Sequence, residues 1–241
     1  MTFGTTGWSL PASFRVYGIY PVSLRRGRRR MKRLSRFALA MWVLSSAVGF
    51  ARQSSQGSNS TTIKGNGDSV SAPITFKTGL LMVGGAFKGT SNFIVQVMGE
   101  REGSDSVPIN SIGTYSGVRL VPIEAGRYRL SVKADQPWVV MYEQPDPAKV
   151  GDPLPISHKM KGDSVMGAIK LNTGLLTAEF SHDGSRNFIV TLYRASGELV
   201  GVLANKIGSY KGQHVERISV AGSHYIDIKA DGAWSIALSM N

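Results

Sequence analysis

Hydrophobic and polar residues alternate along most of this chain after residue 73, in short runs broken by Gly, Asn, Asp and Ser. Alternation of this kind indicates half-buried β-strands, and no stretch keeps the apolar spacing of a long amphipathic helix. The pattern predicts strands at 74–76, 80–87, 92–98, 107–112, 118–123, 127–134 and 138–142, and a second set between 169 and 238.

Residues on one face of a strand recur at every second position, and this spacing identifies the expected core. In each set, one strand carries a Phe-x-Val face and another begins with a Trp. Two such faces packed together make a small sandwich. We therefore predict an all-β fold of two tandem antiparallel β-sandwich domains, jelly-roll-like or immunoglobulin-like. The expected core includes Phe93, Val95, Trp138, Phe188, Val190 and Trp234.

The two sets of strands share sequence at a spacing of 95 residues, which becomes 96 at Lys-Ala-Asp (133–135 and 229–231) after a one-residue insertion. The matching pairs are Gly-Asp-Ser-Val at 67–70 and 162–165, Thr-Gly-Leu-Leu at 78–81 and 173–176, and Asn-Phe-Ile-Val at 92–95 and 187–190. Solenoid repeats have much shorter periods. The spacing therefore predicts two tandem domains, at 68–143 and 162–241, joined by a proline-rich linker at 144–161.

The net charge of +12 is concentrated near the N-terminus. Residues 1–51 hold nine of the 28 Lys and Arg residues and no acid, which leaves 19 basic residues against 16 acidic ones. This dispersed remainder does not indicate a phosphate-binding surface, so we expect no nucleic-acid partner.

The basic cluster precedes an uncharged apolar run at 37–51, and this order is typical of a secretory signal peptide. We expect a signal peptide at 31–51, with cleavage between Ala51 and Arg52, and a secreted or periplasmic protein that meets the membrane only through this segment. Residues 1–30 are either not translated, with a start at Met31, or a long basic region of the signal. Residues 52–67 are polar and predict a flexible leader.

The sequence offers little for catalysis. Its four histidines, at 158, 182, 214 and 224, have no histidine at the matching position of the first set. The sequence contains no Gly-x-Ser-x-Gly elbow, no Walker loop and no His-Glu-x-x-His motif. Without cysteine or closely spaced histidines we expect no zinc. Asp135, Asp231 and Asp183 offer calcium ligands, but Asp beside Gly is also what tight turns need. We predict no enzyme activity, cofactor or metal.

The most suggestive shared motif is Asn-x-Ile-Gly-x-Tyr-x-Gly, at 110–117 and 205–212. A tyrosine between glycines can present its ring to a sugar or a protein partner, or it can close a corner of the sandwich. Asn92 and Asn187 begin the Phe-x-Val strands, where they either contact a ligand or stabilise a turn. The candidate ligand-binding residues are Tyr115, Tyr210, Asn92, Asn187 and Arg186.

The motifs Gly-(Thr/Ser)-x-Asn-Phe-Ile-Val, Asn-x-Ile-Gly-x-Tyr-x-Gly and Lys-Ala-Asp-x-x-Trp together resemble tandem-repeat β-sandwich domains of uncharacterised secreted or surface proteins of bacteria. The resemblance covers nearly all of residues 70–241. It implies an all-β extracellular or envelope module and brings no catalytic residues.

Three functional hypotheses follow. The first is an exported, non-enzymatic module that binds a polysaccharide or another envelope component through two similar sites. The second is a structural or protein-interaction role in the envelope, in which sheet edges pair with a partner protein. The third, an enzyme, needs His182, His214 or His224 to converge with an acid in a cleft.

Overall fold

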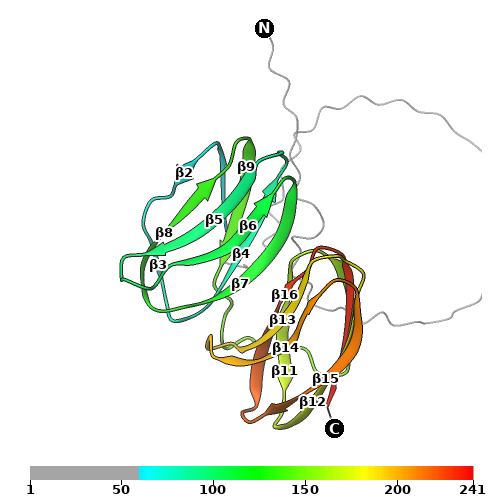
Figure 1. Ribbon diagram of the computed structural model, residues 1–241. Coiled ribbons are helices and arrows are strands. Elements are labelled where there is room, and N and C mark those ends of the chain that lie inside the picture. The colour runs from blue at the N-terminus through cyan, green and yellow to red at the C-terminus, as the bar shows by residue number, and fades with distance from the viewer. Residues whose placement is uncertain (1–59, 241) are drawn as a thin grey trace, which may run out of the picture. The chain divides into compact units, whose positions relative to one another are not determined.

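The computed structural model describes residues 60–240, which belong to one compact unit and form strands and no helix. The all-β prediction is thus confirmed. The strands make four antiparallel sheets, paired as an N-terminal sandwich (β1–β9) and a C-terminal sandwich (β10–β17) (Figure 1). Within residues 60–240, no helix is long and apolar enough to cross a membrane.

One sheet of the N-terminal sandwich has the order β1 (Thr61–Asn66), β9 (Pro137–Glu143), β4 (Gly79–Phe87) and β7 (Tyr115–Ile123). The facing sheet has the order β2 (Ser69–Val70), β8 (Gly126–Lys133), β5 (Asn92–Gly99) and β6 (Ser106–Ile112), with β3 (Ile74–Phe76) also paired to β8. Strands β3 to β9 lie where the alternation predicts them, within a few residues at their ends.

The C-terminal sandwich has the same strand order. One sheet runs β10 (Ile156–Lys161), β17 (Ala233–Met240), β12 (Gly174–His182) and β15 (Tyr210–Ile218). The other runs β11 (Ser164–Leu171), β16 (Gly222–Lys229), β13 (Asn187–Arg194) and β14 (Leu199–Ile207). In both sandwiches the turn that contains the Gly-x-Tyr motif therefore carries the chain from one sheet to the other.

Each sandwich encloses its own core. The six expected core residues are all buried, with the three N-terminal ones in one cluster and the three C-terminal ones in another. The indole Nε1–H of Trp138 donates to the carbonyl oxygen of Gly67 at 2.8 Å, and that of Trp234 donates to Gly162 at 2.9 Å. A buried indole needs such an acceptor, which gives the shared glycines a structural role.

The aspartates after these glycines also serve turns. Asp68 Oδ1 accepts the backbone N–H of Ala134 at 3.0 Å, and Asp163 Oδ1 accepts that of Ala230 at the same distance. Gly67 and Gly162 have φ of +75° and +76°, a region that favours glycine. Gly-Asp and Lys-Ala-Asp, far apart in sequence, thus form one hydrogen-bonded corner in each sandwich.

Two sequence predictions were wrong in part. Thr61–Asn66, placed in a flexible leader, is strand β1 and pairs with β9, and Ile156–Lys161, placed in the linker, is strand β10 and pairs with β17. Both segments alternate, but with few apolar residues. These segments form strands because their backbone groups hydrogen-bond to a neighbouring strand of the sheet. A short polar sequence does not indicate such pairing. The predicted signal peptide and its cleavage point lie outside the described residues.

The sandwiches contact each other through a third, smaller apolar cluster. Leu80 and Met82 on β4 and Leu120 on β7 pack with Ala168 on β11 and Tyr225 on β16. Burial raises the pKa of Tyr225 to about 12. Part of the outer surface of the β1-β9-β4-β7 sheet, formed by β4 and β7, is therefore covered by the C-terminal sandwich.

A buried ion pair borders this cluster. The Arg119 guanidinium donates from Nε to Asp227 Oδ1 at 3.0 Å and from Nη2 to Asp227 Oδ2 at 2.6 Å, while the backbone N–H of Leu120 donates to Asp227 Oδ1 at 2.9 Å. Burial acts to lower the pKa of Arg119, but the hydrogen bonds and charge of Asp227 outweigh it and raise the pKa. Arg119 is thus held charged at the junction.

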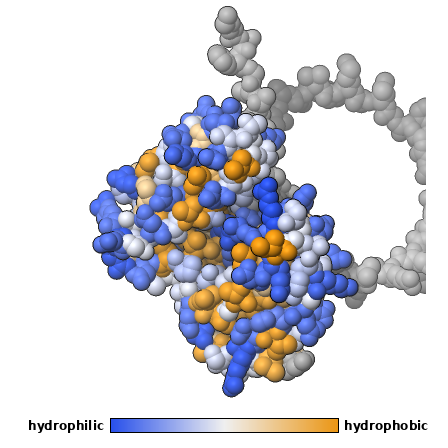
Figure 2. All heavy atoms as spheres, in the orientation of Figure 1, coloured by the Kyte–Doolittle hydropathy of each residue, from blue (hydrophilic) through white to orange (hydrophobic). Residues whose placement is uncertain are grey.

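Several large hydrophobic side chains stay exposed elsewhere. Val107 and Ile112 on β6 and Val202 and Ile207 on β14 are examples, and the two pairs occupy matching positions. Figure 2 shows hydrophobic residues in separate patches between hydrophilic ones on the face in view. Both β6 and β14 are the last strands of their sheets.

Candidate functional site

The two candidate tyrosines begin matching strands but have different surroundings. Tyr115, at the start of β7, is half-buried, and its hydroxyl donates to Asp163 Oδ2 at 3.0 Å. Burial, and then the charge of Asp163, raise the pKa of Tyr115 above its ordinary value. Since Asp163 belongs to the C-terminal sandwich, Tyr115 joins the two sandwiches.

Tyr210, at the start of β15, has no hydroxyl hydrogen bond of this kind among residues 60–240. Its ring packs against Phe188 with 6.3 Å between ring centroids, and Lys206 Nζ lies 5.5 Å from the ring centroid. An ammonium group at this distance is attracted to the face of the ring. The same motif therefore holds a tyrosine in the junction in one sandwich and leaves it half-buried beside a lysine in the other.

The remaining candidates lie near these turns. Asn92 is exposed opposite Ile112, and Asn187 is exposed opposite Ile207. The backbone N–H of Arg186 donates to Asp231 Oδ2 at 3.0 Å, and its carbonyl accepts the N–H of Gly208 at 2.8 Å. The fold thus brings Arg186, Asn187 and Tyr210 to one end of the C-terminal sandwich. At the matching end of the N-terminal sandwich, Tyr115 instead points into the junction.

The histidines do not converge. His182 on β12, His214 on β15 and His224 on β16 make separate contacts. His182 stacks on Phe188, its Nδ1 lies 3.0 Å from the carbonyl oxygen of Gly208, and its Nε2 lies 3.3 Å from Asp231 Oδ1.

None of these histidines has the partners of a general base. The hydroxyl of Ser185 donates to Asp231 Oδ2 rather than to His182. His214 Nε2 lies 3.2 Å from Glu216 Oε2. Burial lowers the pKa of His224, whose Nδ1 lies 3.0 Å from the carbonyl oxygen of Gly222. A nucleophile hydrogen-bonded to its base, which acyl-transfer chemistry needs, does not occur at these positions.

The candidate calcium ligands form turns. Asp231 Oδ2 accepts the backbone N–H groups of Ser185 and Arg186, each at 3.0 Å. Burial acts to raise the pKa of Asp231, but these hydrogen bonds outweigh it and lower the pKa. Asp183 Oδ1 accepts the N–H of Ala233 at 2.6 Å. In residues 60–240 no cluster of three or more His, Asp or Glu is arranged to hold a metal ion.

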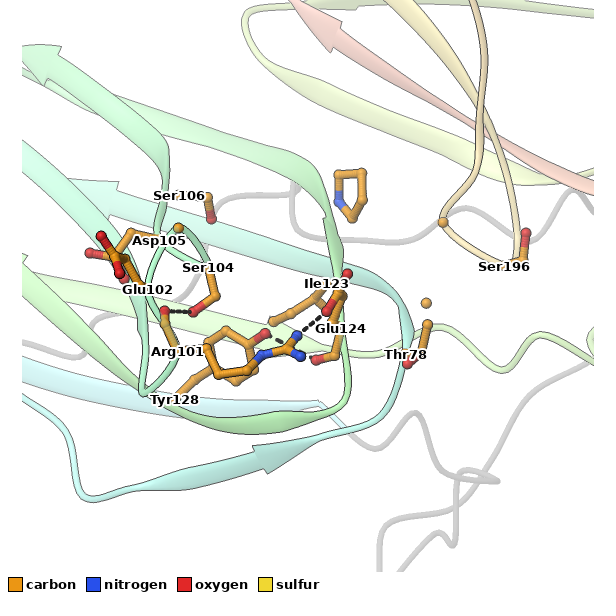
Figure 3. A pocket seen from close by; sticks show the side chains of 14 residues that line it. Thr78, Arg101, Glu102, Ser104, Asp105, Ser106, Ile123, Glu124, Tyr128 and Ser196 are labelled. Atoms are coloured by element: carbon orange, nitrogen blue, oxygen red, sulfur yellow. Dashed lines mark hydrogen bonds and ion pairs between the residues drawn. The ribbon is translucent and has the colours of Figure 1, made fainter.

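Figure 3 shows a cavity that the sequence did not suggest. It lies at the end of the N-terminal sandwich where Gly79 pairs with Ile123, opposite the end where Phe87 pairs with Tyr115. Its volume is about 650 Å³. Its lining comes from the β3–β4 turn, the β5–β6 loop, the β7–β8 turn and, from the C-terminal sandwich, Ser196 and Gly197. Loops at one end of a sandwich are a common place for binding residues.

Fixed polar groups line this cavity. Asp105 accepts the N–H of Gly99 at Oδ1, 3.0 Å away, and Gln96 Nε2 at Oδ2, 3.1 Å away. Figure 3 shows the Arg101 guanidinium directed at the Glu124 carboxylate, with which it forms an ion pair. Beneath them the Tyr128 hydroxyl donates to the carbonyl oxygen of Glu124 at 3.0 Å. These bonds hold the β5–β6 loop and the β7–β8 turn in place.

The wall from the C-terminal sandwich depends on glycine. Gly197 has a φ of +94°, and a Cβ at this position would lie 2.6 Å from the carbonyl oxygen of Gly79. Only a residue without a side chain allows this approach. It sets Ser196 across the cavity from Ser106 (Figure 3). Within residues 60–240, neither of these serine hydroxyls has a hydrogen-bond partner.

The cavity therefore has a polar lining. It presents serine hydroxyls and the carboxylate of Glu102 beside the fixed Asp105 and Arg101. The sequence signal was weak, since Glu-Arg-Glu-Gly-Ser-Asp-Ser at 100–106 is polar in the way of many loops. Ser196 and Gly197 come from the second set of strands, far along the chain from this loop.

No protein-family model matches this chain, and no curated protein matches it either. Among solved structures, it is similar to the PBSX exported protein XepA, with 9% identity, coverage of 76% of this chain and 85% of that chain, and a TM-score of 0.24. A variant of oxalate decarboxylase from Bacillus subtilis matches at 8% identity, 76% and 68% coverage, and a TM-score of 0.24. A fucolectin from Morone saxatilis (striped bass) serum matches with 6% identity, coverage of 76% of this chain and 86% of that chain, and a TM-score of 0.22. With TM-scores this low, these likenesses carry no argument about the site or its chemistry.

Proposed function

We propose that this protein is an exported, non-enzymatic binding module of the bacterial envelope or surroundings, secreted or periplasmic, and that its ligand is a polysaccharide. The observation that carries the proposal is the polar cavity at the loop end of the N-terminal sandwich. The basic and apolar N-terminal pattern supports export.

The chemistry of the lining favours a sugar. A saccharide offers many hydroxyl groups, each a donor and an acceptor. The cavity offers serine hydroxyls, carboxylates and a guanidinium that can satisfy them. Its volume falls in the range of small-ligand sites, roughly 300–1,000 Å³.

The test is a binding screen of the purified protein against neutral and charged polysaccharides. A Ser106→Trp variant fills the cavity, and a Thr90→Trp variant places the same side chain in an exposed loop at the opposite end of the same sandwich. We expect at least one polysaccharide to bind the wild type and the Thr90 variant about equally, and the Ser106 variant at least tenfold more weakly, a loss of about 1.4 kcal/mol or more.

Removing Asp105 gives a finer test. Each hydrogen bond to a sugar contributes about 1 kcal/mol net, so Asp105→Ala is expected to weaken binding about fivefold. The proposal fails if no polysaccharide binds the wild type, or if Ser106→Trp and Thr90→Trp bind equally well while circular dichroism shows both folded.

A protein-interaction role is the second candidate, because exposed hydrophobic residues recur at matching positions. Val107 and Val202 are about half exposed, and Ile112 and Ile207 are 76% and 81% exposed. Paired exposed apolar side chains on the last strands of two sheets suit contact with an envelope protein. An Ile112→Ser, Ile207→Ser double variant that loses a partner captured by the wild type, yet keeps polysaccharide binding, would favour this role.

A further inference from the structure

The outer surface of one C-terminal sheet, β10-β17-β12-β15, is mostly polar and is exposed among residues 60–240. On β12 the residues Leu176, Ala178, Phe180 and His182 are buried. The residues between them, at 175, 177, 179 and 181, therefore face outward. Residues directly opposite in antiparallel strands share a face, so the register identifies the outward residues of the other three strands as well.

One row of this register crosses the whole sheet. Lys159 on β10 lies opposite Ser235 on β17, which lies opposite Ser181 on β12, which lies opposite Lys211 on β15. With strands about 4.8 Å apart, the two lysine backbones stand about 14 Å from each other. Both lysines are exposed, and the two serine hydroxyls between them are 2.6 Å apart and hydrogen-bonded.

The charge on this face is predominantly positive. Lys161 extends the basic edge along β10, and Arg217 lies on β15 opposite Leu175. Glu179 on β12 is the one acid among the outward residues of these four strands, and β17 contributes only small uncharged side chains. The face therefore has four basic groups at its two edges, with small side chains on β17 and the single acid Glu179 on β12 between them.

The matching face of the N-terminal sandwich has the opposite character. Its corresponding row is Lys64, Val139, Ala86 and Ser116, and the neighbouring row has Met141 and Gly84 at its centre. Leu80, Met82 and Leu120 on this face are buried against the C-terminal sandwich. At the matching positions Leu175, Thr177 and Val215 make no such contact. One sheet face thus serves the junction between the sandwiches, while its basic counterpart takes no part in that junction among residues 60–240.

We propose that the outer face of β10-β17-β12-β15 is a second binding surface, which takes an anionic polysaccharide bearing carboxylate or sulfate groups. The two lysine edges complement anionic groups on a chain laid across the strands, and the serine pair between them keeps hydroxyl donor and acceptor capacity for sugar hydroxyls. The outward residues of β17 are Ser and Ala, and the large apolar side chains of this face, Leu175 and Val215, are about half exposed toward its β15 edge. A membrane-docking face also carries apolar residues beside basic ones, so vesicles are one of the ligands tested.

This surface goes beyond the cavity of the N-terminal sandwich and is tested separately. The variant is Lys159→Glu with Lys211→Glu, which reverses both ends of the central row. The control is Lys64→Glu with Lys133→Glu, an equal change of net charge at two exposed lysines of the N-terminal sandwich. The ligands are alginate, dextran sulfate, uncharged dextran, vesicles with anionic phospholipid, and double-stranded DNA.

We expect alginate or dextran sulfate to bind the wild type at low salt and more weakly as salt screens the charges. The Lys159, Lys211 variant is expected to lose about tenfold or more in affinity, and the control about twofold or less. An equal loss in both variants, no loss in either, or stronger binding to vesicles or DNA than to the anionic polysaccharides overturns the proposal. Ser106→Trp is expected to leave binding to this surface unchanged. A failure of this proposal can therefore be told apart from a failure of the proposed cavity site.

Discussion

Removing the Arg119 guanidinium is expected to loosen the junction between the sandwiches. Arg119→Ala deletes both hydrogen bonds to Asp227 and leaves that carboxylate, whose side chain is 6% exposed, with the Leu120 N–H as its donor. Breaking a buried ion pair in this way costs about 3–5 kcal/mol. The molecule avoids part of this cost by opening the junction, since Asp227 is then hydrated.

The apolar cluster sets how far opening proceeds. Leu80, Met82 and Leu120 are each at most 4% exposed, and opening exposes all three. At about 2 kcal/mol each, they hold the junction with roughly 6 kcal/mol. A penalty near 3 kcal/mol therefore leaves the closed state dominant but raises the open fraction by about two orders of magnitude.

Amide hydrogen exchange measures this opening directly. The N–H groups of Val118 and Leu120 point away from β4 and donate to Asp163 and Asp227 of the C-terminal sandwich. Their exchange is expected to accelerate about 100-fold in Arg119→Ala, while amides in the cores of both sandwiches keep their protection. His214→Ala, at the matching position of β15, is the control. Unchanged protection of Leu120 in Arg119→Ala would refute the assignment of this pair as a clamp.

Three further predictions concern the cores and the junction. Trp234→Ala is expected to lose about 3–5 kcal/mol, a large part of a typical domain's stability; unchanged thermal melting would contradict the buried indole. His182→Phe is expected to lower the free energy of unfolding in urea by under about 1 kcal/mol, because Phe87 stacks on Phe93 at the matching position of the N-terminal sandwich. His182→Ala is expected to lower it by roughly 2–3 kcal/mol. The pKa of Tyr225 is raised to about 12, so the folded state keeps a proton that the unfolded state releases above about pH 10. Stability is therefore expected to fall by up to about 3 kcal/mol between pH 10 and 12, and a smaller alkaline loss in Tyr225→Phe, measured by melting at about pH 9 and pH 11, checks this.

The sequence predicted the strands best where alternation decides burial. Phe93 and Val95 point inward because every second residue of β5 does so. Strands β1 and β10 were missed, since Thr61–Asn66 has Ile63 as its only large apolar residue and depends on pairing with β9. Local pattern carries no information about a partner strand at the far end of the same domain.

The sites were harder to predict, because their residues meet only through the tertiary fold. Tyr115 and Tyr210 share a motif, yet Tyr115 alone meets an aspartate of the other sandwich. Asp227 stands at an outward position of β16, and the sequence does not reveal that Arg119 covers it. The cavity joins the loop at 100–106 to Ser196 through the glycine contact of Gly197 with Gly79.

The cavity and the junction are coupled, because Ser196 and Gly197 reach the cavity only when the sandwiches are closed. Apparent affinity falls in proportion to the closed fraction. Arg119→Ala alone leaves that fraction near one, so its polysaccharide affinity is expected to change less than about twofold.

Adding Met82→Ala and Leu120→Ala removes roughly 4 kcal/mol more and tips the balance to the open state. The closed fraction then falls to about one sixth, so the triple variant is expected to bind polysaccharide about sixfold more weakly, although every residue of the β5–β6 loop is intact. Full affinity in a triple variant whose residue 120 amide exchanges freely would mean that the N-terminal sandwich binds the sugar without its neighbour.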